Sequence, residues 1–409
     1  MTRSLPHDWT GIDGMIVDIV GVAHGGHMVA RHEGRVIFVR HALPGERVKI
    51  RVTEESRTFL RADAIEVLSA SPHRVSPPCP VAGTCGGCDF QHVDEAGQLE
   101  LLTTVVREQL ARIAKIDFDV SVEPIGEMLG WRTRMDWAVD PQGKAGLRRH
   151  RSHEVLPNPP CLIAHRDLPS VDAAWNGDRV RAVVTSSGQK FVAASEPIPD
   201  VLASECTGVL DHRGTRVTGS DTAVERVHGR RFEVSPIGFW QVHPRAAETL
   251  VDAVLDFAQP QPGETAFDLY SGVGLFSAFL ADHVGATGAV HAIEGSRHAQ
   301  QHAMRNVAEF PQAHIHHGSV EKVLHSGRVP KSADLIVADP PRAGAKAAIP
   351  LIASRGASRI VHVACDPAAL ARDITIYRQQ GYFLRDLRAF ALFPMTHHVE
   401  CVALFEPTS

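Results

Sequence analysis

The segment Asp268-Leu269-Tyr270-Ser271-Gly272-Val273-Gly274 closes the first of several apolar runs in the last third of the chain. Those runs are TAFDLY, GAVHAIE, DLIVAD and RIVHVAC, and segments of helical character follow them from about residues 275, 297, 345 and 368. Repeated βαβ units form a parallel sheet with helices on both faces. LRAFALF and VECVALF have no helix between them, which predicts a terminal antiparallel pair. The pattern therefore predicts an α/β, Rossmann-like fold.

Residues suited to ligand binding follow three of these predicted strands. Gly272 and Gly274 allow a ligand to approach the backbone closely, and Ser277 stands where the dinucleotide pattern GxGxxG needs a third glycine. Glu294 ends the next strand and is placed to accept hydrogen bonds from ribose hydroxyls, and Asp339-Pro340-Pro341-Arg342 ends the third. Ligands of open α/β sheets bind at the carboxyl ends of the strands, so a nucleotide-like ligand is expected here. The missing glycine favours adenosylmethionine over NAD.

A thiol ends the fourth predicted strand, in Cys365-Asp366-Pro367. Carbon 5 of uracil accepts a methyl group only after a nucleophile adds to carbon 6, and a thiolate adds and leaves well. A base must then remove the proton on carbon 5, and Glu400 is the candidate. Asp366 opposes thiolate formation unless it is turned away or hydrogen-bonded. Taken alone, Cys365 also fits an inert buried cysteine, and Glu400 a surface strand residue.

The N-terminal part has a different pattern. Short β-branched runs between residues 9 and 69, separated by glycine and proline, predict a small barrel of about five strands. Three cysteines follow a proline-rich connector and a fourth lies far downstream: Cys79, Cys85, Cys88 and Cys161. Four thiolates suffice for one iron–sulfur cluster or one zinc, and their spacing does not decide between the two. A helix is predicted at about 98–113, and the region from 120 to 235 has a mixed pattern.

The totals limit the possible classes of protein. A chain of 409 residues predicts two or three domains. No uncharged apolar stretch of about 18 residues occurs, so we expect a cytoplasmic protein without a membrane span. The net charge of -5 is mild, so a nucleic-acid partner would have to bind local basic clusters. These clusters contain Arg31, Arg35, Arg40, Arg47, Lys49, Arg51, Arg132, Arg134, Lys144, Arg148, Arg149 and Arg151, with Phe90, Trp131 and Tyr270 as candidate stacking surfaces.

The strings GFWQVHP, DLYSGVG, VADPPRAG, ACDPAALARD and MTHHVECVALFE resemble the catalytic domain of the RNA 5-methyluridine methyltransferase family. The resemblance implies a class I adenosylmethionine-dependent methyltransferase domain at 236–409, with Cys365 as nucleophile and Glu400 as general base. It also implies that the cofactor contacts are Gln241, Tyr270, Glu294 and Asp339.

The rest of the chain resembles the larger members of this family. Residues 1–70 resemble an RNA-binding TRAM barrel, which is OB-like. CPVAGTCGGCDFQHV resembles the cluster loop of the iron–sulfur members, within a mixed α+β central domain at 71–235. The resemblance implies that Cys79, Cys85, Cys88 and Cys161 hold a 4Fe–4S cluster. It also implies 23S ribosomal RNA as the partner, and it implies no protein partner.

Three alternatives stay open on the sequence alone. The first is a transfer-RNA uridine-5 methyltransferase. The second is an amino-group methyltransferase, whose related motif has an aromatic residue where Arg342 stands. The third is an RNA-binding protein without catalytic activity. Trapping RNA that contains 5-fluorouridine as a covalent adduct separates uridine-5 methylation from amino-group methylation, and a non-catalytic protein would bind RNA without methyl transfer.

Overall fold

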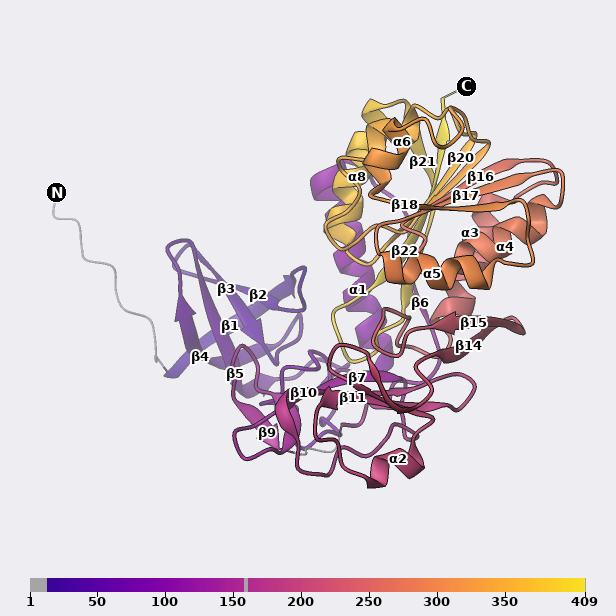
Figure 1. Ribbon diagram of the computed structural model, residues 1–409. Coiled ribbons are helices and arrows are strands. Elements are labelled where there is room, and N and C mark those ends of the chain that lie inside the picture. The colour runs from indigo at the N-terminus through magenta and orange to yellow at the C-terminus, as the bar shows by residue number, and fades with distance from the viewer. Residues whose placement is uncertain (1–12, 158–160, 409) are drawn as a thin grey trace.

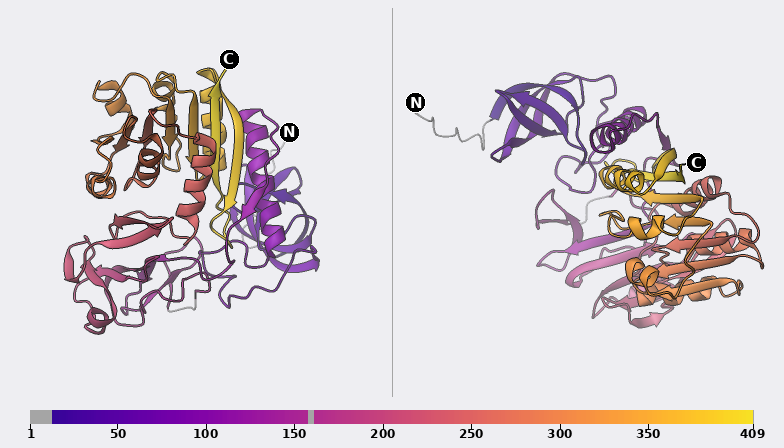
Figure 2. Two further views of the ribbon diagram at one scale, coloured as in Figure 1. Left: turned by 90° about the vertical axis from the view of Figure 1, so that its right-hand side faces the viewer. Right: turned by 90° about the horizontal axis from the view of Figure 1, so that it is seen from above.

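The computed structural model describes residues 13–157 and 161–408. The first twelve residues of the predicted barrel domain therefore lie outside the described part. Figure 1 shows the barrel to one side, a β-rich central part below, and a C-terminal α/β part above it. Two further views show the same three bodies (Figure 2). Within the described ranges, no helix is both long enough and apolar enough to cross a lipid bilayer.

The N-terminal barrel is closed, with strands in the order β1-β2-β3-β5-β4. Alternate residues point inward along each strand, so Ile37, Val39, Val48 and Ile50 are fully buried. This confirms the predicted five-stranded barrel. Its strands are β1 (Asp13–Val22), β2 (Met28–His32), β3 (Arg35–Arg40), β4 (Arg47–Glu55) and β5 (Phe59–Ser69).

The central part is built on a seven-stranded sheet in the order β13-β12-β11-β10-β7-β8-β9. Trp137, Trp175 and Val180 lie in its separate apolar core. A two-stranded hairpin, β14 and β15, leads from this sheet to the C-terminal part. The elements are β7 (Arg134–Val139), β8 (Ala145–Arg148), β9 (Val155–Pro157), β10 (Asn176–Val184), β11 (Lys190–Ser195), α2 (Val201–Glu205), β12 (Gly208–Asp211), β13 (Arg216–Gly219), β14 (Ala223–Val227) and β15 (Arg230–Val234).

The C-terminal sheet has eight strands in the order β18-β17-β16-β19-β20-β22-β21-β6. The strands from β18 to β20 are parallel, and β22 is antiparallel to both β20 and β21, which confirms the predicted fold. The strands are β6 (Val122–Pro124), β16 (Thr265–Leu269), β17 (Ala289–Glu294), β18 (Ala313–His317), β19 (Leu335–Ala338), β20 (Arg359–Ala364), β21 (Tyr382–Ala391) and β22 (Glu400–Pro407). The helices are α3 (Ala246–Ala258), α4 (Leu275–Val284), α5 (Arg297–Asn306), α6 (Val320–His325), α7 (Ile349–Ala353) and α8 (Pro367–Gln379).

Two details of the C-terminal part differ from what the sequence pattern predicts. Strand β6 lies in the predicted central domain, yet it pairs in parallel with β21 of the C-terminal sheet. The predicted domain limits at 70 and 235 stay predictions. The helix expected from residue 345 begins only at Ile349. Gly344 has a φ of +83°, and Asp373 of α8 accepts a hydrogen bond from the backbone nitrogen of Ala345, which holds this segment as a loop.

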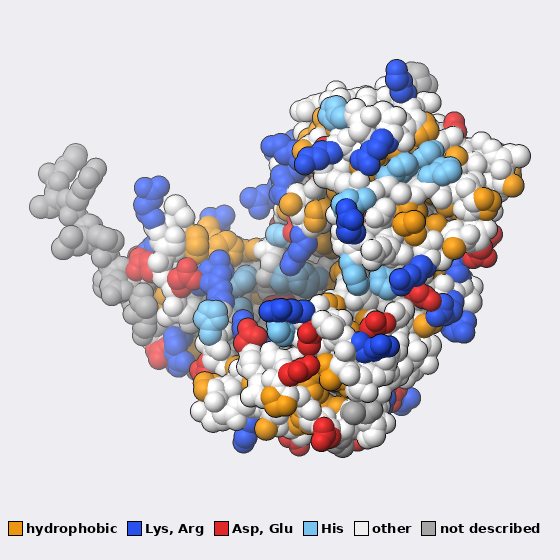
Figure 3. Space-filling model, viewed as in Figure 1, with side chains coloured by type: hydrophobic (Ala, Val, Ile, Leu, Met, Phe, Trp, Pro, Cys, Tyr) orange, Lys and Arg blue, Asp and Glu red, His pale blue; other side chains and the backbone are white. Residues whose placement is uncertain are grey.

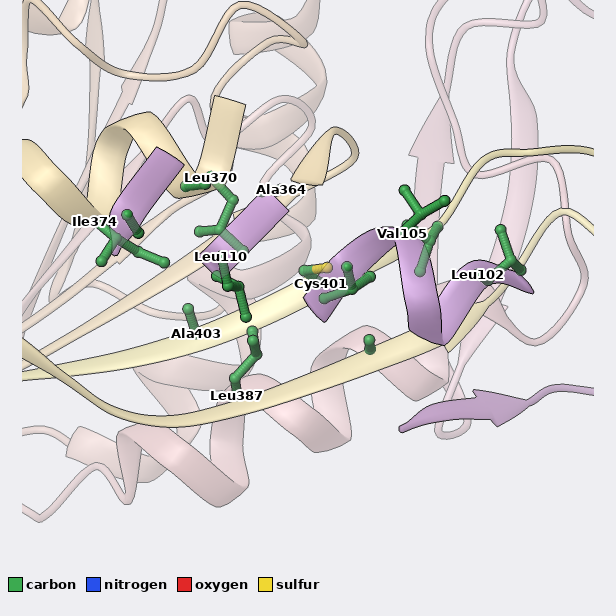
Figure 4. Close-up of a cluster of buried hydrophobic side chains, with 14 of the residues drawn as sticks. Leu102, Val105, Leu110, Ala364, Leu370, Ile374, Leu387, Cys401 and Ala403 are labelled. Atoms are coloured by element: carbon green, nitrogen blue, oxygen red, sulfur yellow. The ribbon is translucent and has the colours of Figure 1, made fainter. Parts of the chain in front are cut away.

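Helix α1 (Glu95–Gln109) and the π-helical turn after it (Leu110–Ala114) confirm the helix predicted at 98–113. Asp94 caps α1 by accepting a hydrogen bond from Gly97. Figure 4 shows Val105 and Leu110 packed over the sheet, close to Cys401, Leu387 and the α8 side chains. A segment from the central region thus forms part of the core of the C-terminal part.

Candidate active site

Four predicted site segments meet at one edge of the C-terminal sheet. The order β17-β16-β19-β20 places the ends of these strands side by side. Glu294 is the last residue of β17, and Tyr270, Asp339 and Cys365 follow β16, β19 and β20. Glu400 joins them because β22 is antiparallel to β20 and begins at this edge. The topology therefore gathers the predicted catalytic and cofactor residues, with the exception of Gln241, from separate parts of the sequence.

The glycine-rich loop after β16 is held by Glu294. The Glu294 carboxylate accepts hydrogen bonds from the backbone nitrogens of Gly272 at 2.8 Å and Ser296 at 2.5 Å. Tyr270 has a φ of +62°, an uncommon left-handed conformation for a residue that is not glycine. An added Cβ at Gly272 would meet no atom within 4 Å, so the loop borders open space.

The same edge has buried polar atoms that need partners. Within the described residues, Ser271 Oγ and Asp268 Oδ1 are buried and have no hydrogen-bond partner. Burial raises the pKa of Asp268 to about 7, and Asp339 adds to this rise. Unpaired buried polar groups beside open backbone suit a polar ligand such as adenosylmethionine.

Charged groups surround the thiol of Cys365, which is half-buried. Burial raises its pKa to about 12, and Glu400 and Asp339 add to the effect. The positive charge of Arg342 acts in the opposite direction and lowers the pKa of the thiol. Burial raises the pKa of Asp339 to about 7, and burial together with Asp339 holds the pKa of Glu400 well above its usual value. The free site therefore retains protons near neutral pH.

The loop before Glu400 is fastened to the cysteine-rich segment. Asp89 accepts hydrogen bonds from His397 through Nδ1 at 2.7 Å and through the backbone nitrogen at 3.1 Å. Gln98 in α1 both donates to Met395 Sδ and accepts from its backbone nitrogen. Arg342 contacts His398 Nδ1 at 3.2 Å, which joins this loop to the segment after β19. Asp89 lies in CPVAGTCGGCDFQHV and His397 in MTHHVECVALFE, but no local pattern in the sequence predicts that the two side chains meet.

Gln241 lies in the segment between β15 and α3 and is partly exposed. This segment is fixed to the central part because Thr133 donates to the Val242 carbonyl through its backbone nitrogen and its hydroxyl. Two residues before Gln241, the side chain of Phe239 is 78% exposed. The exposure of this ring is visible only in the structure.

Several predicted RNA contacts are wrong. Phe90 and Trp131 are 1% and 3% exposed, so neither offers a stacking face. Arg134 is buried and forms an ion pair with Glu225 at 3.0 Å, which makes it part of the central core. Arg148 and Arg151 remain exposed. They lie with Arg149 along a cavity of about 1210 Å³ beside the cysteine-rich loop.

Basic side chains also gather where the three bodies meet. Figure 3 shows a hollow between the barrel and the rest of the molecule, with Lys, Arg and His on its walls. Burial lowers the pKa of His150, and the charges of Arg40 in the barrel and Arg151 in the central part lower it further, whereas Asp89 acts to raise it. These side chains therefore lie close to His150. Such a hollow can accept a polyanion.

The four predicted cluster cysteines share one neighbourhood. Burial raises the pKa of Cys88 to about 12, with contributions from Cys161 and Cys85, and Cys79 raises the pKa of Cys85. Backbone Gly87 donates to Cys85 Sγ, and Gln91 donates to Cys88 Sγ, each at 3.4 Å. Amide donors around sulfur suit thiolate ligands. Across residues 13–157 and 161–408, however, no group of three or more His, Cys, Asp or Glu side chains forms a preassembled metal site.

Two family profiles match the chain. The one described as TRAM domain matches residues 15–65, and the one described as tRNA (Uracil-5-)-methyltransferase matches residues 330–407. An RNA methyltransferase from Streptomyces avermitilis is 47% identical, over 96% of this chain and 98% of its own length. One from Bifidobacterium longum is 36% identical over 95% and 96% of the two chains.

A solved structure has a similar fold. The crystal structure of Pyrococcus abyssi tRNA (uracil-54, C5)-methyltransferase in complex with S-adenosyl-L-homocysteine has a TM-score of 0.72 against this chain. The match covers 95% of this chain and 99% of that one, at 22% sequence identity. Their likeness extends over all three bodies of the molecule.

Proposed function

Because the chain belongs to the RNA 5-methyluridine methyltransferase family, we propose that it methylates carbon 5 of a uridine in RNA with Cys365 as the nucleophile. The observation that carries this proposal is the grouping of Cys365, Glu400 and Asp339 at the strand edge that also bears the glycine-rich loop. Adenosylmethionine supplies the methyl group as a sulfonium.

The thiolate of Cys365 adds to carbon 6 of uracil, and the electron pair of the carbon 5–carbon 6 double bond moves toward the ring carbonyl as an enolate. Carbon 5 then has the electron density to form the bond to the methyl carbon, while the bond from that carbon to the sulfonium sulfur would break and the sulfur would leave as a neutral thioether. Glu400 removes the proton from carbon 5, and the electrons of that bond restore the double bond as the thiolate leaves. Glu400 must be ionised to take this proton, and its raised pKa makes the ionised carboxylate a stronger base.

The remaining residues bind and orient. Arg342 is the cation beside Cys365, so it stabilises the thiolate before attack. Glu294 and Tyr270 border the open side of the glycine-rich loop, and Asp339 lies between that loop and the thiol. With Gln241, these residues are the proposed cofactor contacts. Phe239 is the proposed surface on which a base turned out of the RNA stacks.

For the target we propose 23S ribosomal RNA, taken up in the basic hollow between the barrel and the other two parts. The TRAM barrel and the cysteine-rich loop support it, since the resemblance joins both to ribosomal RNA enzymes. Transfer RNA is the second candidate, because the matching profile and the Pyrococcus abyssi structure carry transfer RNA names. Mapping 5-methyluridine in both RNAs with and without the gene decides between them.

We also propose that Cys79, Cys85, Cys88 and Cys161 hold a 4Fe–4S cluster that stabilises the segment between the barrel and α1. Protein purified without oxygen should contain iron and sulfide and absorb near 400 nm, and Cys88→Ser should lose both signals. Zinc in place of iron would contradict the cluster while leaving the methyl-transfer proposal intact.

Covalent catalysis is tested with RNA that contains 5-fluorouridine, because fluorine on carbon 5 blocks the elimination step. The wild-type protein should form a denaturation-resistant adduct, and Cys365→Ala should form neither adduct nor product. Glu400→Gln should accumulate adduct with ordinary RNA while product release stalls. Cys206→Ala is the matched control, since this cysteine lies in the central part. Full turnover by Cys365→Ala would exclude the proposed mechanism.

A further inference from the structure

Asp366, the residue directly after Cys365, is hydrogen-bonded from two sides. The backbone nitrogen of Ala369 donates to its Oδ1 at 2.7 Å, which makes Asp366 the N-cap of α8. Nε2 of His24 donates to its Oδ2 at 3.1 Å. His24 lies in the turn between β1 and β2, so this second partner comes from the barrel. Both carboxylate oxygens are therefore bonded.

These bonds matter because Cys365 already faces two carboxyl groups. Asp339 and Glu400 both oppose its ionisation, and Arg342 is the cation that favours it. A third carboxylate turned toward the sulfur would suppress the thiolate further. Burial acts to raise the pKa of Asp366, but the hydrogen bonds from His24 and from the backbone nitrogen of Ala369, with Arg372 nearby, lower it to about 2. The partners of this carboxylate are thus His24 on the side of the barrel and Ala369 and Arg372 in α8.

The barrel turn has a defined position on the C-terminal part. Gly26 has a φ of +79°, and a Cβ placed there would lie 2.8 Å from Cβ of His397 and 3.4 Å from Cβ of Asp89. The backbone of the turn therefore lies directly against the loop that precedes Glu400. Such close packing two residues from His24 limits where its imidazole can lie.

We infer that His24 is a positioning residue for the nucleophile, which holds the Asp366 carboxylate away from the sulfur of Cys365. The barrel then contributes to the reactivity of the thiol as well as to RNA binding. This inference rests on the proposed role of Cys365. It adds a specific residue, supplied by a separate folded body, to the reaction.

The test is the rate at which iodoacetamide alkylates Cys365 in the full-length protein between pH 7 and 9, followed by mass spectrometry of its peptide. His24→Ala should slow this rate about threefold, which corresponds to about half a pKa unit. His24→Gln keeps a donor for Asp366 and should react at close to the wild-type rate. His32→Ala is the matched control, because His32 pairs with Glu33 on the surface of the barrel, at the end of β2.

A double-mutant cycle separates positioning from a general loss of structure. Asp366→Asn keeps the N-cap but removes the charge, so His24→Ala should have no effect in that background. An equal slowing in both backgrounds, or no slowing in either, overturns the inference. The alkylation needs neither RNA nor cofactor, so a failed adduct experiment would reject the proposed function without deciding this result.

Discussion

The barrel turn contains two adjacent glycines, and only one of them packs against the loop before Glu400. This difference gives a prediction about the contact between the turn and the loop. Gly25 and Gly26 have φ values of +94° and +79°, so alanine at either position is strained by about 1–2 kcal/mol. A Cβ at Gly25 meets nothing within 4 Å, whereas one at Gly26 lies 2.8 Å from Cβ of His397. Gly25→Ala is therefore a control for backbone strain without the clash.

The clash cannot be relieved cheaply. His397 is held by two hydrogen bonds to Asp89, so moving it weakens a partly buried polar contact, and moving the barrel breaks the His24–Asp366 bond. Overpacking of this kind costs about 1–3 kcal/mol. The segment 393–398 should therefore open between about fivefold and about 150-fold more often in Gly26→Ala than in Gly25→Ala.

Hydrogen–deuterium exchange of the peptide that covers residues 393–398 measures this opening, and single-turnover methyl transfer measures its consequence. Gly26→Ala should exchange faster in this peptide and react more slowly, while Gly25→Ala stays near the wild-type protein in both. If the two variants exchange equally in this segment, the barrel turn does not pack on the catalytic loop as described, and the argument fails.

Three further predictions concern protons and buried charge. Adduct formation should accelerate with pH between 7 and 9, by up to about tenfold per unit, because the pKa of the Cys365 thiol lies near 12; a flat profile would contradict a rate-limiting thiolate. The buried Asp268 carboxyl, with its pKa raised to about 7, contributes stability that is complete below its unfolded pKa of about 3.9 and is lost as pH rises through 7. In urea titrations Asp268→Asn should therefore lose less stability than wild type between pH 5 and 8, and an identical loss would refute this. Arg134→Met should cost about 3–5 kcal/mol in urea unfolding, because it leaves the buried Glu225 without its cation, and adding Glu225→Gln should recover part of that loss.

The sequence was sufficient to predict the strands and the grouping of polar residues at their ends. Apolar runs followed by Glu294, Asp339 and Cys365 predict a parallel sheet, and parallel strands necessarily end at the same edge. That edge was therefore predictable from local patterns, as was the five-stranded barrel. The roles of these residues remain proposals, and their proximity follows from the direction of the strands.

Contacts between distant segments were decided by tertiary structure alone. Asp89 pairs with His397 across 308 positions and His24 with Asp366 across 342, and no local pattern marks either pair. The same reason explains the wrong expectations for Phe90 and Trp131, since an aromatic residue serves equally well in a core or on a surface. Hydrophobic periodicity determines which segments become strands and helices, whereas the packing of separate bodies determines which side chains face water, RNA or each other.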